Sequence, residues 1–204
     1  RMDQALESGG SFLLQNSANS ALIPMKGQTT RLYSLAYSLS YLARANHLPY
    51  EERRKAAEDT IDEIKKHQKP DGGFGYANHT AGASLNTALI ILGLWDVQNK
   101  LKINSSRTLD KAVEALKKSR SKEGLFDYSL GVEVTSKTEN VIEAAARSNV
   151  SEHALFKAGL SSKERLEQAT ARFTKHHNAI ENWTLDRGSK DRPHSGPGAL
   201  ATYY

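Results

Sequence analysis

The segment Gln68-Lys-Pro-Asp-Gly-Gly-Phe-Gly-Tyr76 returns in altered form 52 residues later as Arg120-Ser-Lys-Glu-Gly-Leu-Phe-Asp-Tyr128. Gly72, Phe74 and Tyr76 of the first copy align with a glycine, a phenylalanine and a tyrosine of the second. Self-similarity at a fixed period of this length is typical of repeat proteins, in which each unit buries its apolar face against its neighbours. The chain is therefore predicted to consist of stacked copies of one supersecondary unit.

Within the repeated segment, each residue type has a structural role. Glycines 72, 73 and 75 permit backbone angles that other residues avoid, and the Gln68 side chain can bond backbone groups at the end of the preceding helix. A phenylalanine two residues after the turn glycine can seal the gap between neighbouring hairpins. Phe74 and Phe126 are therefore expected to occupy equivalent buried positions, and we interpret the glycines as turn residues rather than as a phosphate cradle.

Two kinds of helix alternate around these turns. Amphipathic helices with Lys and Glu on their polar face alternate with helices that carry few charges and more Ser, Thr, Tyr and Ala, which is typical of buried helices. The charged helices are expected at 3–16, 50–68 and 107–119, and the uncharged helices at 29–46, 84–98 and 136–148. This alternation predicts an all-α protein of antiparallel hairpins in two concentric layers.

The second half of the sequence is less regular. Residues 150–159 continue or restart the third uncharged helix, and 161–178 form a charged helix capped by Ser161 or Ser162. Residues 186–197 have the composition of a loop, and 198–204 look like the first turn of a fourth uncharged helix. We expect one repeat domain over 1–204, incomplete at its C-terminus, with about four hairpins in an open arc. We expect such an arc to be part of a longer protein or to have its ends covered by a partner subunit.

Composition excludes several classes of function. The net charge is +5, but acidic residues accompany the basic ones in the helices, and no basic stripe with interleaved aromatics indicates nucleic-acid binding. The longest apolar run, residues 88–95, is far below the roughly 20 residues that cross a bilayer. The absence of cysteine excludes disulfides, thiolate metal ligands and a cysteine nucleophile. The compartment stays open.

The helix ending in Gln68, followed by Asp-Gly-Gly-Phe-Gly and a helix of small residues, resembles the repeats of terpenoid cyclases and protein prenyltransferase β-subunits, the α/α toroid superfamily. Residues 3–16 are similar to the helix that precedes such a motif, and 138–204 look like the C-terminal part of uncharacterised bacterial squalene-cyclase-like proteins. The resemblance implies a partial or open α/α toroid whose axis is lined by the inner helices. It also implies a bacterial protein, either cytoplasmic or exported with its leader removed.

The residues that carry the chemistry of that superfamily are missing. The cyclases resemble one another in an Asp-x-Asp-Asp acid, and the nearest acidic loop here, Asp186-Arg-Gly-Ser-Lys-Asp191, does not match it. The prenyltransferases bind zinc through a cysteine, and the thioester branch of the toroids also requires one. We therefore expect no cofactor, no metal and no cyclase activity. The expected role is binding of a ligand or protein partner, with an enzyme on the same fold or a purely structural repeat segment as the alternatives.

Polar groups on the uncharged helices are candidates for a site. Tyr33, Tyr37 and Tyr41 recur every four residues, and form either an aromatic wall or a layer contact with hydroxyls at the rim. Glu139 and Glu143 lie one helical turn apart and could act as a general acid and base. Alternatively, Arg147 at the next turn could form a structural ion pair with them.

The loop after residue 185 gathers five ionisable groups over the expected mouth of the ring. The predicted ligand-binding residues are Tyr33, Tyr37, Asp186, Arg187, Asp191, Arg192 and His194. The catalytic candidates, should the chain be an enzyme, are Glu139, Glu143 and His194.

Overall fold

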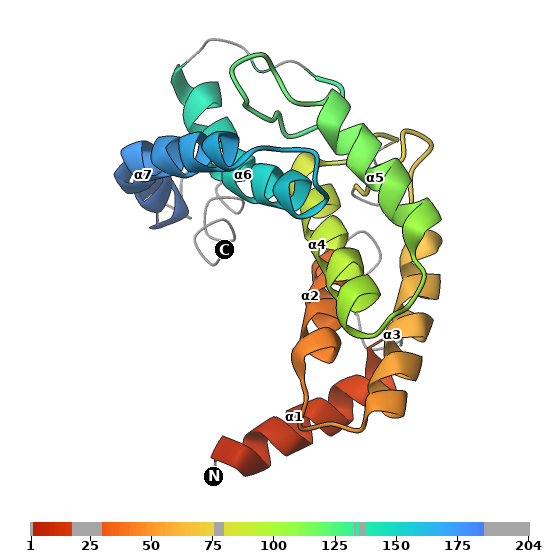
Figure 1. Ribbon diagram of the computed structural model, residues 1–204. Coiled ribbons are helices and arrows are strands. Elements are labelled where there is room, and N and C mark those ends of the chain that lie inside the picture. Colours follow the sequence, from red (N-terminus) through yellow and green to blue (C-terminus); the bar gives the residue numbers. More distant parts are fainter. Residues whose placement is uncertain (1, 18–29, 76–79, 133, 135–137, 186–204) are drawn as a thin grey trace.

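A computed structural model describes residues 2–17, 30–75, 80–132, 134 and 138–185, and this part of the chain holds seven α-helices and no strand (Figure 1). The helices are α1 (Met2–Asn16), α2 (Thr30–Arg44), α3 (Tyr50–Lys65), α4 (Ser84–Lys100), α5 (Ser106–Lys118), α6 (Thr138–Lys157) and α7 (Lys163–Leu185). The predicted all-α class is confirmed for the described residues. None of these helices combines the length and apolar character needed to cross a bilayer.

The helices follow an arc, with α2 and α4 on its inner side and α3 and α5 on its outer side (Figure 1). α4 packs between α2 and α6, while α3 packs against α2, α5 against α4, and α7 against α6. Burial explains this arrangement. In α4, 13 of the 17 residues are buried, whereas α5 buries a single stripe that includes Leu109, Ala112 and Leu116. A helix that is apolar on all sides must lie between neighbours, and a helix with one apolar stripe covers it from outside.

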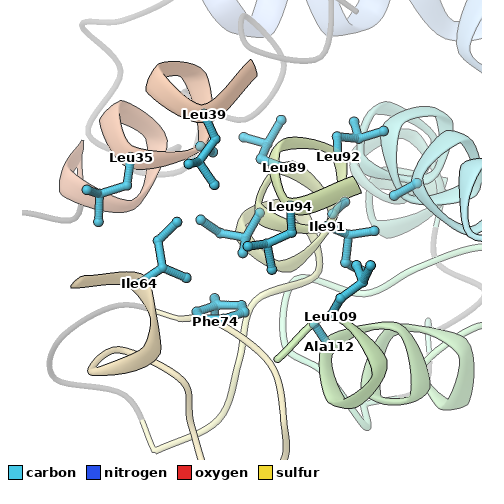
Figure 2. Close-up of a cluster of buried hydrophobic side chains, with 14 of the residues drawn as sticks. Leu35, Leu39, Ile64, Phe74, Leu89, Ile91, Leu92, Leu94, Leu109 and Ala112 are labelled. Atoms are coloured by element: carbon cyan, nitrogen blue, oxygen red, sulfur yellow. The ribbon is translucent and has the colours of Figure 1, made fainter. Parts of the chain in front are cut away.

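The core lies between the two layers. Leucines of α2 and α4 meet Ile64 of α3, Phe74 of the following turn, and Leu109 and Ala112 of α5 (Figure 2). α2 and α4 approach closely at Gly93, where a Cβ would lie 2.9 Å from the carbonyl oxygen of Ala36. The larger of two hydrophobic clusters joins residues from α2 to α6, and a smaller one packs Ala146 of α6 with Ile180 of α7, so the stacked units are stabilised mainly by each other.

The two copies of the repeated segment have the same backbone conformation. An isolated bridge joins Gln68 to Phe74, and another joins Arg120 to Phe126. The Gly72 N–H donates to the Lys69 carbonyl at 2.9 Å, and the Gly124 N–H donates to the Ser121 carbonyl at 3.0 Å. Both glycines have positive φ, +89° and +76°. The period of 52 residues in the sequence is therefore also a period of the structure.

Both phenylalanines are fully buried, as the repeat predicted. The Phe74 N–H donates to the Thr87 hydroxyl of α4 at 2.9 Å, and the Phe126 N–H donates to the Ser148 hydroxyl of α6 at 3.0 Å. Each turn is thus attached to the inner helix that follows it. The Gln68 amide bonds backbone groups, but not at the end of α3 as expected: its Nε2 donates to the Gly72 carbonyl of the turn at 2.9 Å and to the Thr108 carbonyl of α5 at 3.0 Å.

The sequence-based bounds differ from the structure mainly after residue 136. The segments expected at 136–148 and 150–159 are one helix, α6, and α7 continues seven residues beyond the expected end at 178. Ser162 rather than Ser161 caps α7, since its hydroxyl accepts the N–H of Arg165 at 3.3 Å. The loop expected at 186–197 and the helical turn expected at 198–204 lie outside the described residues.

Candidate functional site

An open groove of about 930 Å³ lies along α2, beside α1. We call it the tyrosine groove; its lining residues are Leu13 of α1 and Tyr33, Ser34, Tyr37, Ser38, Ser40, Tyr41 and Arg44 of α2. The α2 residues recur at three- and four-residue spacing, so they share one helical face, opposite the leucines that pack against α4. The exposed surface of the groove is mostly apolar, because the tyrosine rings form its wall.

The groove owes its shape to a close approach of α1 to the end of α2. A Cβ at Gly10 would lie 2.9 Å from a methyl group of Leu48 and 3.2 Å from the Tyr41 hydroxyl, so a glycine allows this approach. The Tyr41 hydroxyl lies 3.3 Å from Nε2 of His47, and the two rings meet edge to face. These contacts hold the Tyr41 ring at one end of the groove.

At the same end, the groove meets a cluster of charges from three inner helices. Arg44 of α2 donates to the buried carboxylate of Asp96 on α4 at 2.7 Å, while 67% of the Arg44 side chain stays exposed. Lys157 of α6 lies with its Nζ 4.8 Å from the ring centroid of Trp95. Arg44 can therefore bind Asp96 and still present donors to a ligand in the groove.

His153 of α6 belongs to this cluster. Partial burial lowers the pKa of its imidazole below the ordinary value of 6.5, and the positive charges of Lys157 and Arg44 act in the same direction, against the opposite effect of Asp96. The histidine is thus held neutral at neutral pH. Protonation of this imidazole would add a positive charge beside those of Lys157 and Arg44.

The structure brings together some of the predicted site residues. Tyr33 and Tyr37 line one groove with Tyr41, and Tyr33 also packs at the edge of the core, so features of both interpretations are present and their role in binding stays a prediction. Glu143 lies 3.6 Å from Nη1 of the buried Arg147, which confirms the ion-pair interpretation of that glutamate. Burial lowers the pKa of Arg147, and the nearby carboxylates of Glu143 and Asp127 oppose this shift.

Other predicted residues cannot be placed. The side chain of Glu139 and all of Asp186, Arg187, Asp191, Arg192 and His194 lie outside the described residues. The acid–base pair and the ionisable loop therefore stay predictions. Among the side chains that the structure describes, no three carboxylates and imidazoles gather as metal ligands.

A buried ion pair between Arg120 and Glu152 was not predicted. Arg120 Nη1 donates to Glu152 Oε1 at 2.8 Å, and the Ser161 hydroxyl donates to the same oxygen. The Glu152 carboxylate is almost fully buried, and its Oε2 has no hydrogen-bond partner. The sequence did carry a signal: Arg120 occupies the repeat position of Gln68, and a buried arginine needs an acidic partner.

Two comparisons with known proteins identified no relative of this chain. A scan against protein-family models and a search of curated proteins both found no match. Functional inference therefore rests on the residues and their geometry.

Proposed function

We propose that this chain is an arc of the α/α toroid class that binds a ligand in the tyrosine groove. The alternation of two helical layers and the conserved geometry of the turns at 68–74 and 120–126 support the architectural part of the proposal. The groove itself supports the functional part. Its volume of about 930 Å³ lies within the range of roughly 300 to 1,000 Å³ that is usual for small-molecule sites.

The lining residues favour a ligand with an apolar or aromatic body and one anionic group. Tyrosine rings offer flat apolar surface, and the hydroxyls of Ser38 and Ser40 are able to donate or accept along its edge. Among the described lining residues Arg44 alone is charged, and a guanidinium binds carboxylate, sulfonate or phosphate groups. The observation that carries the proposal is the pairing of a tyrosine-lined wall with the exposed guanidinium of Arg44.

The dye 8-anilinonaphthalene-1-sulfonate has this chemistry and tests the proposal directly. We expect saturable binding of one dye per chain, with a rise in dye fluorescence. Tyr37→Ser should weaken binding about tenfold, which corresponds to about 1.4 kcal/mol and to the loss of roughly half a buried side chain. Arg44→Gln should weaken it by a similar factor and remove most of its dependence on salt.

A matched control variant is Phe156→Ser on α6. Phe156 is 38% exposed and Tyr37 36% exposed, so both changes remove a similar exposed aromatic surface, but Phe156 does not line the groove. Binding should survive Phe156→Ser unchanged. Equal loss in the two variants, or no loss with Tyr37→Ser, would show that the dye does not report the tyrosine groove and would refute the proposal.

A further inference from the structure

A second, strongly basic groove lies on the other layer of the arc, between the end of α3 and the length of α5. Two adjoining hollows of about 560 and 460 Å³ form it and share Lys65, Gln68 and Lys111. We call it the basic groove; its cations are Lys65, Lys69, Arg107, Lys111 and Lys118. None of its described lining residues also lines the tyrosine groove.

The charge of the basic groove is largely uncompensated. Lys65 contacts Asp62 at 2.8 Å, but within the described part of the chain the other four cations form no ion pair. Two carboxylates also line the groove, and both are engaged elsewhere. Asp71 accepts the N–H groups of Gly73 and Gly82 at 2.8 and 2.7 Å, and Glu114 lies 3.7 Å from the Lys117 ammonium.

The cations are arranged in a line. Arg107, Lys111 and Lys118 are spaced by four and seven residues, so they follow one face of α5. At 1.5 Å per residue, the distance along the helix from Arg107 to Lys118 is about 16 Å. An extended polypeptide rises about 3.3 Å per residue, so about five residues would span this line.

We propose that the basic groove binds an extended acidic polypeptide segment of about five to six residues, rich in Asp and Glu. The line of unpaired cations complements alternate carboxylates of such a segment, and the hydroxyls of Ser106 and Thr108 lie beside it as additional hydrogen-bonding groups. A nucleic acid fits less well, because among the described residues no aromatic side chain lines either hollow to offer bases a stacking surface. This inference does not depend on the proposed function.

Fluorescence anisotropy of a fluorescein-labelled hexaglutamate peptide tests the inference on the full chain at about 50 mM salt. We expect binding of one peptide per chain that weakens as salt is raised. The double variant Arg107→Glu with Lys111→Glu should weaken binding at least tenfold. Glu114→Lys, which removes a carboxylate from the groove, should strengthen it several-fold. Both changed cations are exposed, and circular dichroism would verify that the variants stay folded.

The control is the double variant Lys100→Glu with Lys175→Glu, which changes the net charge equally at exposed positions outside the groove. Less than threefold weakening in this control supports the groove as the site. A tenfold loss in both double variants would mean that the peptide responds only to net charge, and would overturn the inference. An absence of peptide binding would also overturn the inference. So would tighter binding of a single-stranded oligonucleotide of equal charge, if that binding were lost when Lys111 is replaced.

Discussion

Replacement of the turn glycines by alanine should produce graded losses of stability that depend on what lies beside each glycine. Gly72, Gly131 and Gly159 all have positive φ, between +75° and +89°. An alanine in this region costs about 1–2 kcal/mol, and reduced freedom of the unfolded chain offsets roughly 0.4–1 kcal/mol of that. At Gly131 and Gly159 no atom lies within 4 Å of an added Cβ, so each change should cost only about 0.5–1 kcal/mol.

Gly72 differs because an added Cβ would lie 2.7 Å from the backbone carbonyl oxygen of Lys111. Backbone cannot rotate away as a side chain can, so the turn must shift from α5. The shift lengthens the 3.0 Å bond from Gln68 Nε2 to the Thr108 carbonyl, a partly buried hydrogen bond whose loss costs about 1–3 kcal/mol. Added to the backbone strain, Gly72→Ala should destabilise the chain by about 3 kcal/mol.

Urea unfolding followed by circular dichroism at 222 nm measures these differences, provided that the slope with denaturant is the same in all variants. Gly124→Ala is an informative intermediate, because an added Cβ would lie 3.2 Å from the guanidinium of Arg172, a side-chain group that also donates to the Gly124 carbonyl at 3.2 Å. A side chain can shift where backbone cannot, so the cost should lie between that of the two controls and that of Gly72→Ala. If Gly72→Ala proved no more destabilising than Gly131→Ala, the close packing of the turn on α5 would be refuted.

Two other perturbations test the core and the charge cluster. Both turn phenylalanines are fully buried, so Phe74→Ala and Phe126→Ala should each lower the free energy of unfolding in urea by about 3–5 kcal/mol. The control Phe156→Ala, at an exposed position, should lower it by under about 1 kcal/mol. A similarly small loss for Phe74→Ala would contradict the equivalence of the two turns. The pKa of His153 is lower in the folded chain than its ordinary 6.5, so its contribution to stability is present above about pH 6.5 and is lost as the pH falls. The urea midpoint should fall between pH 7.5 and 5.5, and His153→Gln should make this fall smaller. The control His176→Gln should leave the fall unchanged. If His153→Gln also left it unchanged, the pKa of His153 would not be lowered in the folded chain.

The sequence was sufficient to predict the elements that depend on local pattern. The turn segment after Gln68, the burial of Phe74 and Phe126, and the alternation of charged and uncharged helices all follow from residue types at fixed spacing. The length of α6 was not predictable in the same way. Ser148, Asn149 and Val150 are weak helix formers, but burial of Ser148 and Val150 against neighbouring elements keeps that helix continuous.

The candidate site was predicted only in part. The spacing of Tyr33, Tyr37 and Tyr41 indicated a shared face, but the groove also needs Leu13, and its position depends on the approach of α1 at Gly10. The spacing of residues along one helix does not predict where a second helix will cross it. The basic groove was missed for a similar reason, because its cations come from α3, the turn after it and α5, and in both helices acids are interspersed with the basic residues along the sequence.

The pairing of Arg120 with Glu152 implies a dependence between two distant positions in the evolution of this fold. Loss of either side chain alone strands the other charge in a buried place, a change that typically costs 3–5 kcal/mol, whereas simultaneous replacement by neutral residues avoids that cost. Positions 120 and 152 are thus expected to covary among homologues. The two printed partners of the Gln68 amide are backbone carbonyls, which every residue possesses, so they place no such constraint on another side chain. The two copies of the repeated segment are thus expected to differ in their tolerance to mutation at this position.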